Sequence, residues 1–292
     1  MRFLFVDRIL HLSSEYIQGI KHITSDDYFL CQDPQGEVGF IPSLIGESLG
    51  QLAAWNIMFH NDFTKRPVAG VVASARLSRP AYVGETLLLE SFIDDVDEVA
   101  VRYHSVARIG DEIVFQIENA LGPLLPMSDF IDTDVVRSQF AEIFRPIAQT
   151  VARISANEER IHVPQLNLTS MVFDRILSIE PNVQLCAEKY ISRSAAYFPD
   201  HFPFNPVLPM TVLLECKLNL AREFLARSSF NKNYAITELR RIKMNEFVRP
   251  GDVLICYLTV KQHNEHGLVL SFRSEVDGKR VCVLEVEMRL KE

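Results

Sequence analysis

One histidine and two glutamates in this chain have the residue types and the spacing for proton-transfer chemistry. His201 precedes Glu215 by fourteen residues, and Asp33 precedes Glu47 by the same fourteen residues. Histidine titrates near neutral pH and can act as a base. A carboxyl group in an apolar environment is desolvated, which favours its protonated form and lets it act as an acid. The pattern therefore indicates a paired base and acid.

An internal repeat sets these two pairs in register. Residues 6–10, Val-Asp-Arg-Ile-Leu, return 167 positions later as residues 173–177, Phe-Asp-Arg-Ile-Leu. The turn at residues 84–85 (Gly-Glu) returns at the same offset as residues 251–252 (Gly-Asp). One copy offers aspartate and glutamate where the other offers histidine and glutamate. The repeat therefore indicates one working site built from two unequal halves.

Each copy must place its acid on a long apolar helix surrounded by strands. Segment 43–59 has small or apolar residues nearly all the way round, which is typical of a helix buried on most sides. Segment 210–225 is its somewhat more amphipathic counterpart. Runs rich in Val, Ile and Leu, separated by Gly-Asp and Asp-Gly pairs, predict antiparallel strands joined by hairpins. We expect these strands over residues 69–79, 84–93, 98–109, 111–120, 235–246, 252–263, 266–276 and 280–290. The pattern predicts an α+β fold that occurs twice.

The length of 292 residues suits two domains. We expect domain 1 over residues 1–123 and domain 2 over residues 168–292. The intervening segment, 124–167, has no counterpart in the repeat and is predicted to be a linker. Apolar residues at roughly helical spacing between 134 and 144 predict a surface helix within it.

The bulk composition argues against several classes of protein. With 48% hydrophobic and 23% charged residues, the chain has an ordinary globular composition. A net charge of −8 argues against nucleic-acid binding. No stretch approaches the ~20 apolar residues of a membrane span, and the amino terminus does not resemble a signal peptide. The five scattered cysteines, without C-x-x-C spacing, favour reduced thiols in a cytoplasmic protein and argue against a metal site.

The segment around the histidine, residues 200–215, resembles the signature of the β-hydroxyacyl-ACP dehydratases, the FabA/FabZ group of hotdog-fold enzymes. That signature runs Gly-His-Phe-Pro, then Pro-Val-Met-Pro-Gly, then an acid fourteen residues after the histidine. The residues in register with it are His201, Phe202, Pro203, Pro206, Val207, Pro209 and Glu215. The family's glycine after the last proline is Met210 here.

The first copy keeps a different part of the same signature. Residues 47–51, Glu-Ser-Leu-Gly-Gln, resemble the family's Glu-Ala-Met-Ala-Gln, and Asp33-Pro34 stands where the family has His-Phe. The resemblance covers roughly residues 3–122 and 168–290. It implies a double hotdog, with two hotdog domains in tandem, each an antiparallel sheet wrapped around a long central helix.

The resemblance also implies how the site is divided, because in this family the histidine and the acid come from different hotdogs. The expected catalytic pair is His201 of the second copy with Glu47 of the first, supported by Gln51, which lies one helical turn further on. The opposite pair, Asp33 with Glu215, lacks a histidine and is expected to be silent. Asp33 is then a loop-capping residue. A site that uses Glu215 across a dimer of chains is the alternative.

Further contacts follow from the same resemblance. Phe202, Pro203 and Pro209 are expected to bind substrate, together with Ser43 and Leu44, near which the amides at the start of a helix would stabilise an enolate. A basic group at the tunnel mouth is a candidate docking surface for an acidic acyl carrier protein (ACP). Its members are Arg240, Arg241, Lys243 and Arg249. Solvated charges on strand faces are the alternative interpretation of that group.

The resemblance implies a 3-hydroxyacyl-ACP dehydratase that forms a trans-2-enoyl thioester in fatty acid, polyene or polyketide synthesis. The substrate would be carried on the phosphopantetheine of ACP, with no further cofactor, and the protein could form a homodimer or a hetero-oligomer of hotdogs. Two alternatives remain open. One is a hotdog thioesterase, and the other is a non-catalytic partner that binds acyl-ACP or another dehydratase subunit. The length of the acyl chain is expected to depend on the depth of the tunnel, which packing of the side chains sets.

Overall fold

The computed structural model describes residues 3–24, 27–33, 35–146, 171–193, 195–230, 234–265 and 267–290. The elements of the first half are β1 (Arg8–Leu12), β2 (Tyr16–His22), β3 (Leu30–Gln32), β4 (Val38–Phe40), α1 (Pro42–His60), β5 (Lys65–Pro67), β6 (Val71–Leu77), β7 (Thr86–Val96), β8 (Ala100–Ile109) and β9 (Glu112–Pro126). A 3-10 turn (Met127–Asp129) and helix α2 (Thr133–Ile143) follow. The elements of the second half are β10 (Arg175–Glu180), β11 (Gln184–Tyr190), α3 (Met210–Ala226), β12 (Tyr234–Met244), β13 (Val253–Asn264), β14 (Gly267–Val276) and β15 (Lys279–Leu290). The predicted strands and both predicted long helices are confirmed.

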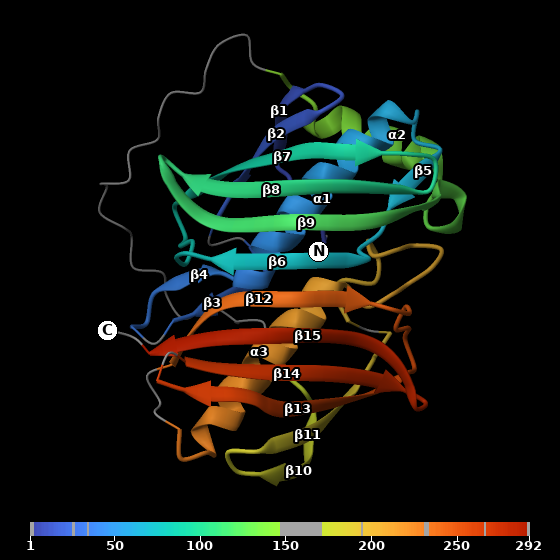
Figure 1. The fold of residues 1–292 in the computed structure, drawn as a ribbon. Coiled ribbons are helices and arrows are strands. Elements are labelled where there is room, and N and C mark those ends of the chain that lie inside the picture. Colours follow the sequence, from blue (N-terminus) through green and yellow to red (C-terminus); the bar gives the residue numbers. More distant parts are fainter. Residues whose placement is uncertain are drawn as a thin grey trace.

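The two halves share one antiparallel sheet. In the described part of the chain, the sheet runs in the order β1-β2-β7-β8-β9-β6-β12-β15-β14-β13-β11-β10, with β5 paired to β9. The halves join where β6 pairs with β12, with Ala75 opposite Leu239 and Val72 opposite Ile242. Figure 1 shows the two long helices, α1 in blue and α3 in orange, covered on one side by this sheet. The double hotdog predicted from the sequence is confirmed.

Helix α1 is buried because its sequence leaves almost no polar face. Twelve of its nineteen residues are buried, and it begins with Pro42, whose fixed φ suits the first helical position. Two polar side chains inside it donate hydrogen bonds to backbone carbonyls. Ser48 Oγ donates to the carbonyl of Leu44 at 2.8 Å, and Asn56 Nδ2 donates to the carbonyl of Ser13 at 2.7 Å. The helix can therefore be enclosed by strands on several sides with both of these donors hydrogen-bonded.

The turns that join the strands depend on glycine at two repeated positions. Gly84 and Gly251, related by the internal repeat, have φ values of 93° and 99°. An L side chain rarely adopts this left-handed conformation, whereas glycine does so without steric cost. These turns lead into β7, which packs against α1, and into β13 at the equivalent place in the second half. The repeat in the sequence is thus a repeat of backbone geometry.

Helix α2 belongs to the predicted linker and packs against the first half. Its amino terminus is capped by Asp132, whose Oδ1 accepts from the amides of Asp134 and Val135 at 2.9 and 3.4 Å. The Phe140 ring lies 5.9 Å from the ring of Trp55 on α1. The helix predicted within 134–144 is confirmed, although it covers α1 instead of lying free on the surface. Linker residues 147–167 lie outside the described residues.

None of the described helices is both long enough and apolar enough to cross a membrane.

Candidate active site

A cavity of ≈ 300 Å³ lies between the two halves of the chain. Helix α1 contributes Glu47 and Gln51 to its wall, and the segment before α3 contributes His201, Phe202 and Pro203. Trp55 and Met58, further along α1, and Val135, Val136 and Gln139 of α2 also line it. Two parts of the chain separated by more than 150 residues therefore meet in one chamber. Most of the groups that line it are apolar.

Glu47 is held by hydrogen bonds to both of its carboxyl oxygens. Gln51 Nε2 donates to Oε1 at 3.0 Å, and Thr211 Oγ1 on α3 donates to Oε2 at 2.8 Å. Gln51 is itself fixed by the chain near the amino terminus, because its Oε1 accepts from the amide of Phe5 and its Nε2 donates to the carbonyl of Phe3. Glu47 is thus oriented by both halves of the protein. A threonine hydroxyl can donate or accept, so it suits a carboxylate and a carboxylic acid alike.

His201 has the tautomer of a base that points into the cavity. Its Nδ1 lies 2.9 Å from the carbonyl oxygen of Val207. Because a carbonyl oxygen can only accept, Nδ1 carries the proton and Nε2 keeps its lone pair in the neutral ring. Burial lowers the pKa of His201 below its usual value; the charge of Glu47 opposes this shift and that of Arg66 adds to it. His201 is therefore neutral at pH 7 and able to accept a proton.

Aromatic rings fix the position of the imidazole. The His201 ring stacks on that of Phe202, with 4.1 Å between centroids and 23° between planes. Phe3 approaches it edge-on at 5.9 Å, and Phe130 packs edge-on against Phe202 at 5.0 Å. A ring enclosed in this way loses little conformational freedom when substrate binds.

The structure adds two residues that sequence reasoning missed, Arg66 and Tyr103. The guanidinium carbon of Arg66 lies 3.9 Å from the ring centroid of Phe202, and burial lowers the pKa of Arg66 to about 10, so the group stays charged at pH 7. Tyr103 on β8 also lines the cavity, and burial raises its pKa to about 12. The segment 65–69, Lys-Arg-Pro-Val-Ala, carries no motif, so no feature of the sequence could have singled out Arg66.

Three of the predicted substrate-binding residues do not reach this cavity. Ser43 and Leu44 are buried at the start of α1 and do not line it. Pro209 is the buried residue before α3, and its neighbours Leu208 and Met210 line the cavity instead. The prediction is corrected because α1 and α3 pack against each other, which places the start of α3 beside Glu47.

The opposite pair, Asp33 and Glu215, lies outside this cavity. Asp33 Oδ1 accepts from the amides of Gln35 and Glu37 at 2.9 Å, and Oδ2 accepts from the hydroxyl of Tyr82 at 2.8 Å. Burial acts to raise the pKa of Asp33, but these hydrogen bonds outweigh it and hold the pKa below its usual value. The prediction that Asp33 caps a loop is confirmed. Glu215 is buried, with Oε1 3.4 Å from Arg222 Nη1.

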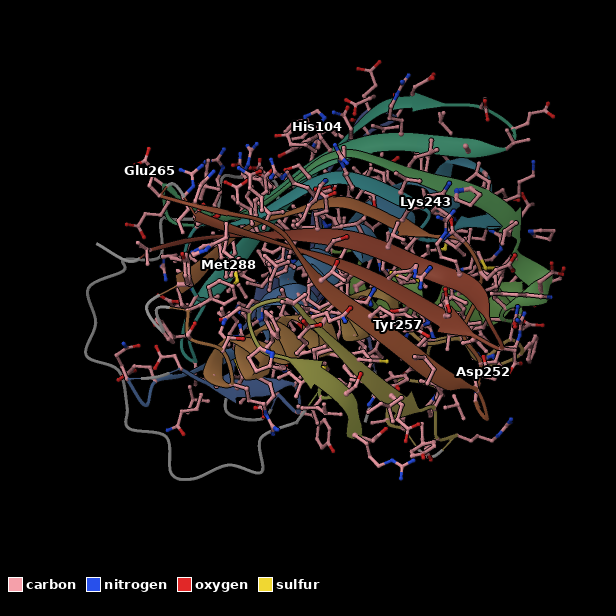
Figure 2. All side chains as sticks on the ribbon, turned by 60° about the horizontal axis from the view of Figure 1, so that its bottom comes forward. His104, Lys243, Asp252, Tyr257, Glu265 and Met288 are labelled. Atoms are coloured by element: carbon pink, nitrogen blue, oxygen red, sulfur yellow. The ribbon has the colours of Figure 1, made fainter. Side chains whose placement is uncertain are left out.

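The predicted docking group is partly neutralised. Arg240 Nη2 lies 2.7 Å from Glu287 Oε2, and Arg241 Nη1 lies 3.2 Å from Glu285 Oε1. Arg249 is exposed beside Phe247, a residue that lines the cavity. Lys243 is exposed and makes no ion pair with any described residue. Figure 2 shows Lys243 where the two halves of the sheet join, between His104 on β8 and Tyr257 on β13.

Within the described residues, no three His, Cys, Asp or Glu side chains gather in an arrangement that could hold a metal ion.

The chain is a double-hotdog protein, because one antiparallel sheet covers its two central helices. A histidine and a glutamate from different halves lie in one cavity of this fold. Residues 178–285 match the ApeI-like dehydratase family. The 3-hydroxyacyl-[acyl-carrier-protein] dehydratase FabZ of Latilactobacillus sakei is 32% identical over 123 residues, which is 84% of that protein and 40% of this chain. The chain therefore belongs to the FabZ-related family of 3-hydroxyacyl-[acyl-carrier-protein] dehydratases.

Solved structures support the fold over most of the chain. An oleoyl thioesterase from Lactobacillus plantarum has a TM-score of 0.59 at 12% identity, with 95% of this chain and 97% of that chain covered. A MaoC-like dehydratase has a TM-score of 0.50 at 12% identity, with 87% and 85% covered. Because these identities are low, the likeness concerns the double-hotdog architecture and not the reaction.

Proposed function

We propose that this protein removes water from a 3-hydroxyacyl thioester carried on ACP and forms a trans-2-enoyl thioester. The observation that carries the proposal is that His201 and Glu47, from different halves, line one largely apolar cavity. The bond from His201 Nδ1 to Val207 leaves Nε2 as the acceptor that a base requires. The family relationship supports the same type of reaction.

In the proposed reaction, His201 Nε2 takes the proton from C2 of the substrate. The electron pair of the C2–H bond first forms an enolate with the thioester carbonyl, and it then forms the C2–C3 double bond as the C3–O bond breaks. Glu47, in its protonated form, donates a proton to the departing hydroxyl, which leaves as water. Gln51 and Thr211 hold the carboxyl group in place during this transfer. The remaining apolar wall excludes bulk water from the reacting atoms.

ACP is the proposed source of the substrate. Acyl carrier proteins are acidic, and Arg249 and Lys243 are exposed cations on the second half. Arg249 lies beside Phe247, whose side chain lines the cavity, so a partner bound there would be close to the chamber. Arg240 and Arg241 contribute less to this surface because glutamates of β15 already pair with them.

Hydration of trans-2-enoyl-ACP, the reverse of the proposed reaction, tests the function directly. His201→Ala and Glu47→Gln are each expected to abolish hydration, because each removes one of the two proton-transfer groups. Asp33→Ala and Glu215→Gln are matched controls from the opposite pair and are expected to keep most of the activity. A wild-type protein that releases free thiol from acyl-ACP without adding water to the double bond would be a thioesterase instead.

A further inference from the structure

Arg66 brings a positive charge into a cavity that is otherwise mostly apolar. Of the described residues that line this chamber, it is the one lysine or arginine. Transfer of a charge out of water is costly unless the charge meets a partner. The apolar packing of the chamber therefore does not explain why a charged side chain lies in its wall.

No acceptor in the described part of the chain takes a hydrogen bond from Arg66, and no carboxylate there lies within ion-pair distance of it. Its Nε is shielded from solvent and has no partner. The residue as a whole is half-buried and lines the cavity, so its terminal nitrogens are the donors left to face the chamber. A guanidinium group is a rigid, planar donor that suits an oxygen with negative charge.

The position of this guanidinium group is tied to the catalytic pair. It lies 3.9 Å from the ring centroid of Phe202 and 5.9 Å from that of Phe130. The ring of Phe202 in turn stacks on His201 at 4.1 Å. Arg66 is also close enough for its charge to act on both His201 and Glu47. A donor held by two aromatic rings next to the base is preorganised for whatever charge develops there.

When the C2 proton is removed, the negative charge that remains is shared between C2 and the thioester oxygen. We propose that Arg66 donates a hydrogen bond from its guanidinium group to this oxygen and stabilises the enolate, and this inference rests on the proposed function. The C2–H electron pair moves toward C1, the thioester oxygen takes up the charge, and the charge returns when the C3–O bond breaks. Arg66 stays protonated throughout. The weakly polar wall strengthens the attraction because little water screens it.

Arg66→Met and Arg66→Lys test this role by enoyl-ACP hydration, with Arg273→Met as the matched control. The Arg273 guanidinium also lies over an aromatic ring, 4.8 Å from the centroid of Tyr257, but outside the cavity. We expect Arg66→Met to lower kcat by about 10²–10³ with KM changed only a few-fold, as for the loss of an oxyanion donor. Arg66→Lys should recover part of kcat, and Arg273→Met should resemble the wild type.

A binding experiment keeps the inference independent of turnover. Octanoyl-pantetheine thioester and the corresponding octyl thioether differ only in the carbonyl oxygen, and neither can be hydrated. The wild-type protein should prefer the thioester, and Arg66→Met should weaken binding of the thioester a few-fold, in line with the small change in KM, while leaving that of the thioether unchanged. If the wild type shows this preference but no hydration, the proposed dehydratase function fails and the role of Arg66 in binding the thioester stands.

Three results would overturn the role of Arg66. The first is a kcat of Arg66→Met within twofold of the wild type in a protein that hydrates enoyl-ACP. The second is an equal loss of affinity for the thioester and the thioether. The third is a loss confined to acyl chains that carry a carboxylate, which would make Arg66 a recognition site for that substituent instead of an oxyanion donor.

Discussion

At the scale of single residues, the cavity combines the proposed base His201, the proposed acid Glu47 and the cation Arg66, whose charges act on one another. The bond from Nδ1 to the carbonyl of Val207 decides which nitrogen of His201 can take a proton. Burial and the charge of Arg66 both disfavour the protonated imidazole, whereas Glu47 favours it. The net effect keeps His201 in the form that the proposed reaction uses.

This balance predicts the pH dependence of the reaction. Because the pKa of His201 is lowered, kcat/KM should stay high as the pH falls through about 6.5, the ordinary value for histidine, and decline only below it. Replacement of Arg66 by glutamine removes a positive charge that disfavours the imidazolium, so the acidic limb should move to higher pH. A pH profile of kcat/KM for the wild type and for Arg66→Gln would locate the acidic limb of each. NMR of the histidine ring protons would follow the protonation of His201 itself. A limb that stays in place in Arg66→Gln would contradict the electrostatic argument.

Removing the Thr211 hydroxyl should lower kcat less than replacing Glu47 itself. Thr211→Val keeps the shape of the side chain but removes the hydrogen bond to Glu47 Oε2, so kcat should fall about tenfold or less, in line with a bond worth about 1 kcal/mol. Thr237→Val is the matched control, since Thr237 Oγ1 bonds to the carbonyl of Glu287 outside the cavity. Equal activities of the two variants would show that Thr211 does not position Glu47.

At the scale of elements, α2 makes the two halves functionally unequal. It is the helix without a counterpart in the repeat, and it covers α1 through the contact of Phe140 with Trp55. Val135, Val136 and Gln139 of α2 form part of the cavity wall. Helix α2 of the predicted linker is therefore part of the chamber, and its side chains help to set the space for the acyl chain of the proposed substrate.

The cap of α2 gives a stability prediction. Asp132→Ala removes the two hydrogen bonds from backbone amides that cap the amino terminus of α2. This change should lower the free energy of unfolding by about 1 kcal/mol. Asp129→Ala removes the same charge from an exposed position without a cap and serves as the control. Urea unfolding of both variants would measure the difference. Equal midpoints would mean that packing of Phe140 alone holds the helix.

At the scale of the whole molecule, the seam between β6 and β12 brings the two halves together. Ser74 Oγ donates to Glu238 Oε1 across it at 2.6 Å, and Arg76 pairs with the same carboxylate at 3.4 Å. This pairing continues one sheet through both halves, so Glu47 of one half and His201 of the other share a cavity within a single chain.

This arrangement predicts the result of a complementation test. His201→Ala and Glu47→Gln chains, co-expressed and purified together, should show no enoyl-ACP hydration, because each chain has one damaged site and no intact one. The wild-type chain co-expressed with either variant provides the control for expression and assembly. Recovered activity in the mixture of variants would mean that the site forms between chains, from His201 of one chain and Glu47 of another. The alternative that uses Glu215 across a dimer predicts instead that Glu47→Gln is active on its own.

Most of the fold could be predicted from the sequence because its causes are local. The apolar segments 43–59 and 210–225 form helices by composition, and Gly84 and Gly251 mark turns by their backbone freedom. His201 and Glu47 were found through a motif that keeps its spacing along the chain. Each of these features depends on residues that are close together in the sequence, so it can be predicted without a structure.

The residues that only the tertiary structure revealed depend on contacts between distant parts of the chain. Arg66 enters the cavity because β5 pairs with β9 and its side chain meets Phe202, which is far away in sequence. Packing of α1 against α3 places Thr211 against Glu47 and Met210 in the cavity wall, whereas Ser43 does not line the cavity. The sequence by itself determined the repeat, the central helices and the candidate base and acid. The tertiary structure alone decided which side chains surround them, since long-range packing sets the environment of a group and leaves no periodic pattern in the sequence.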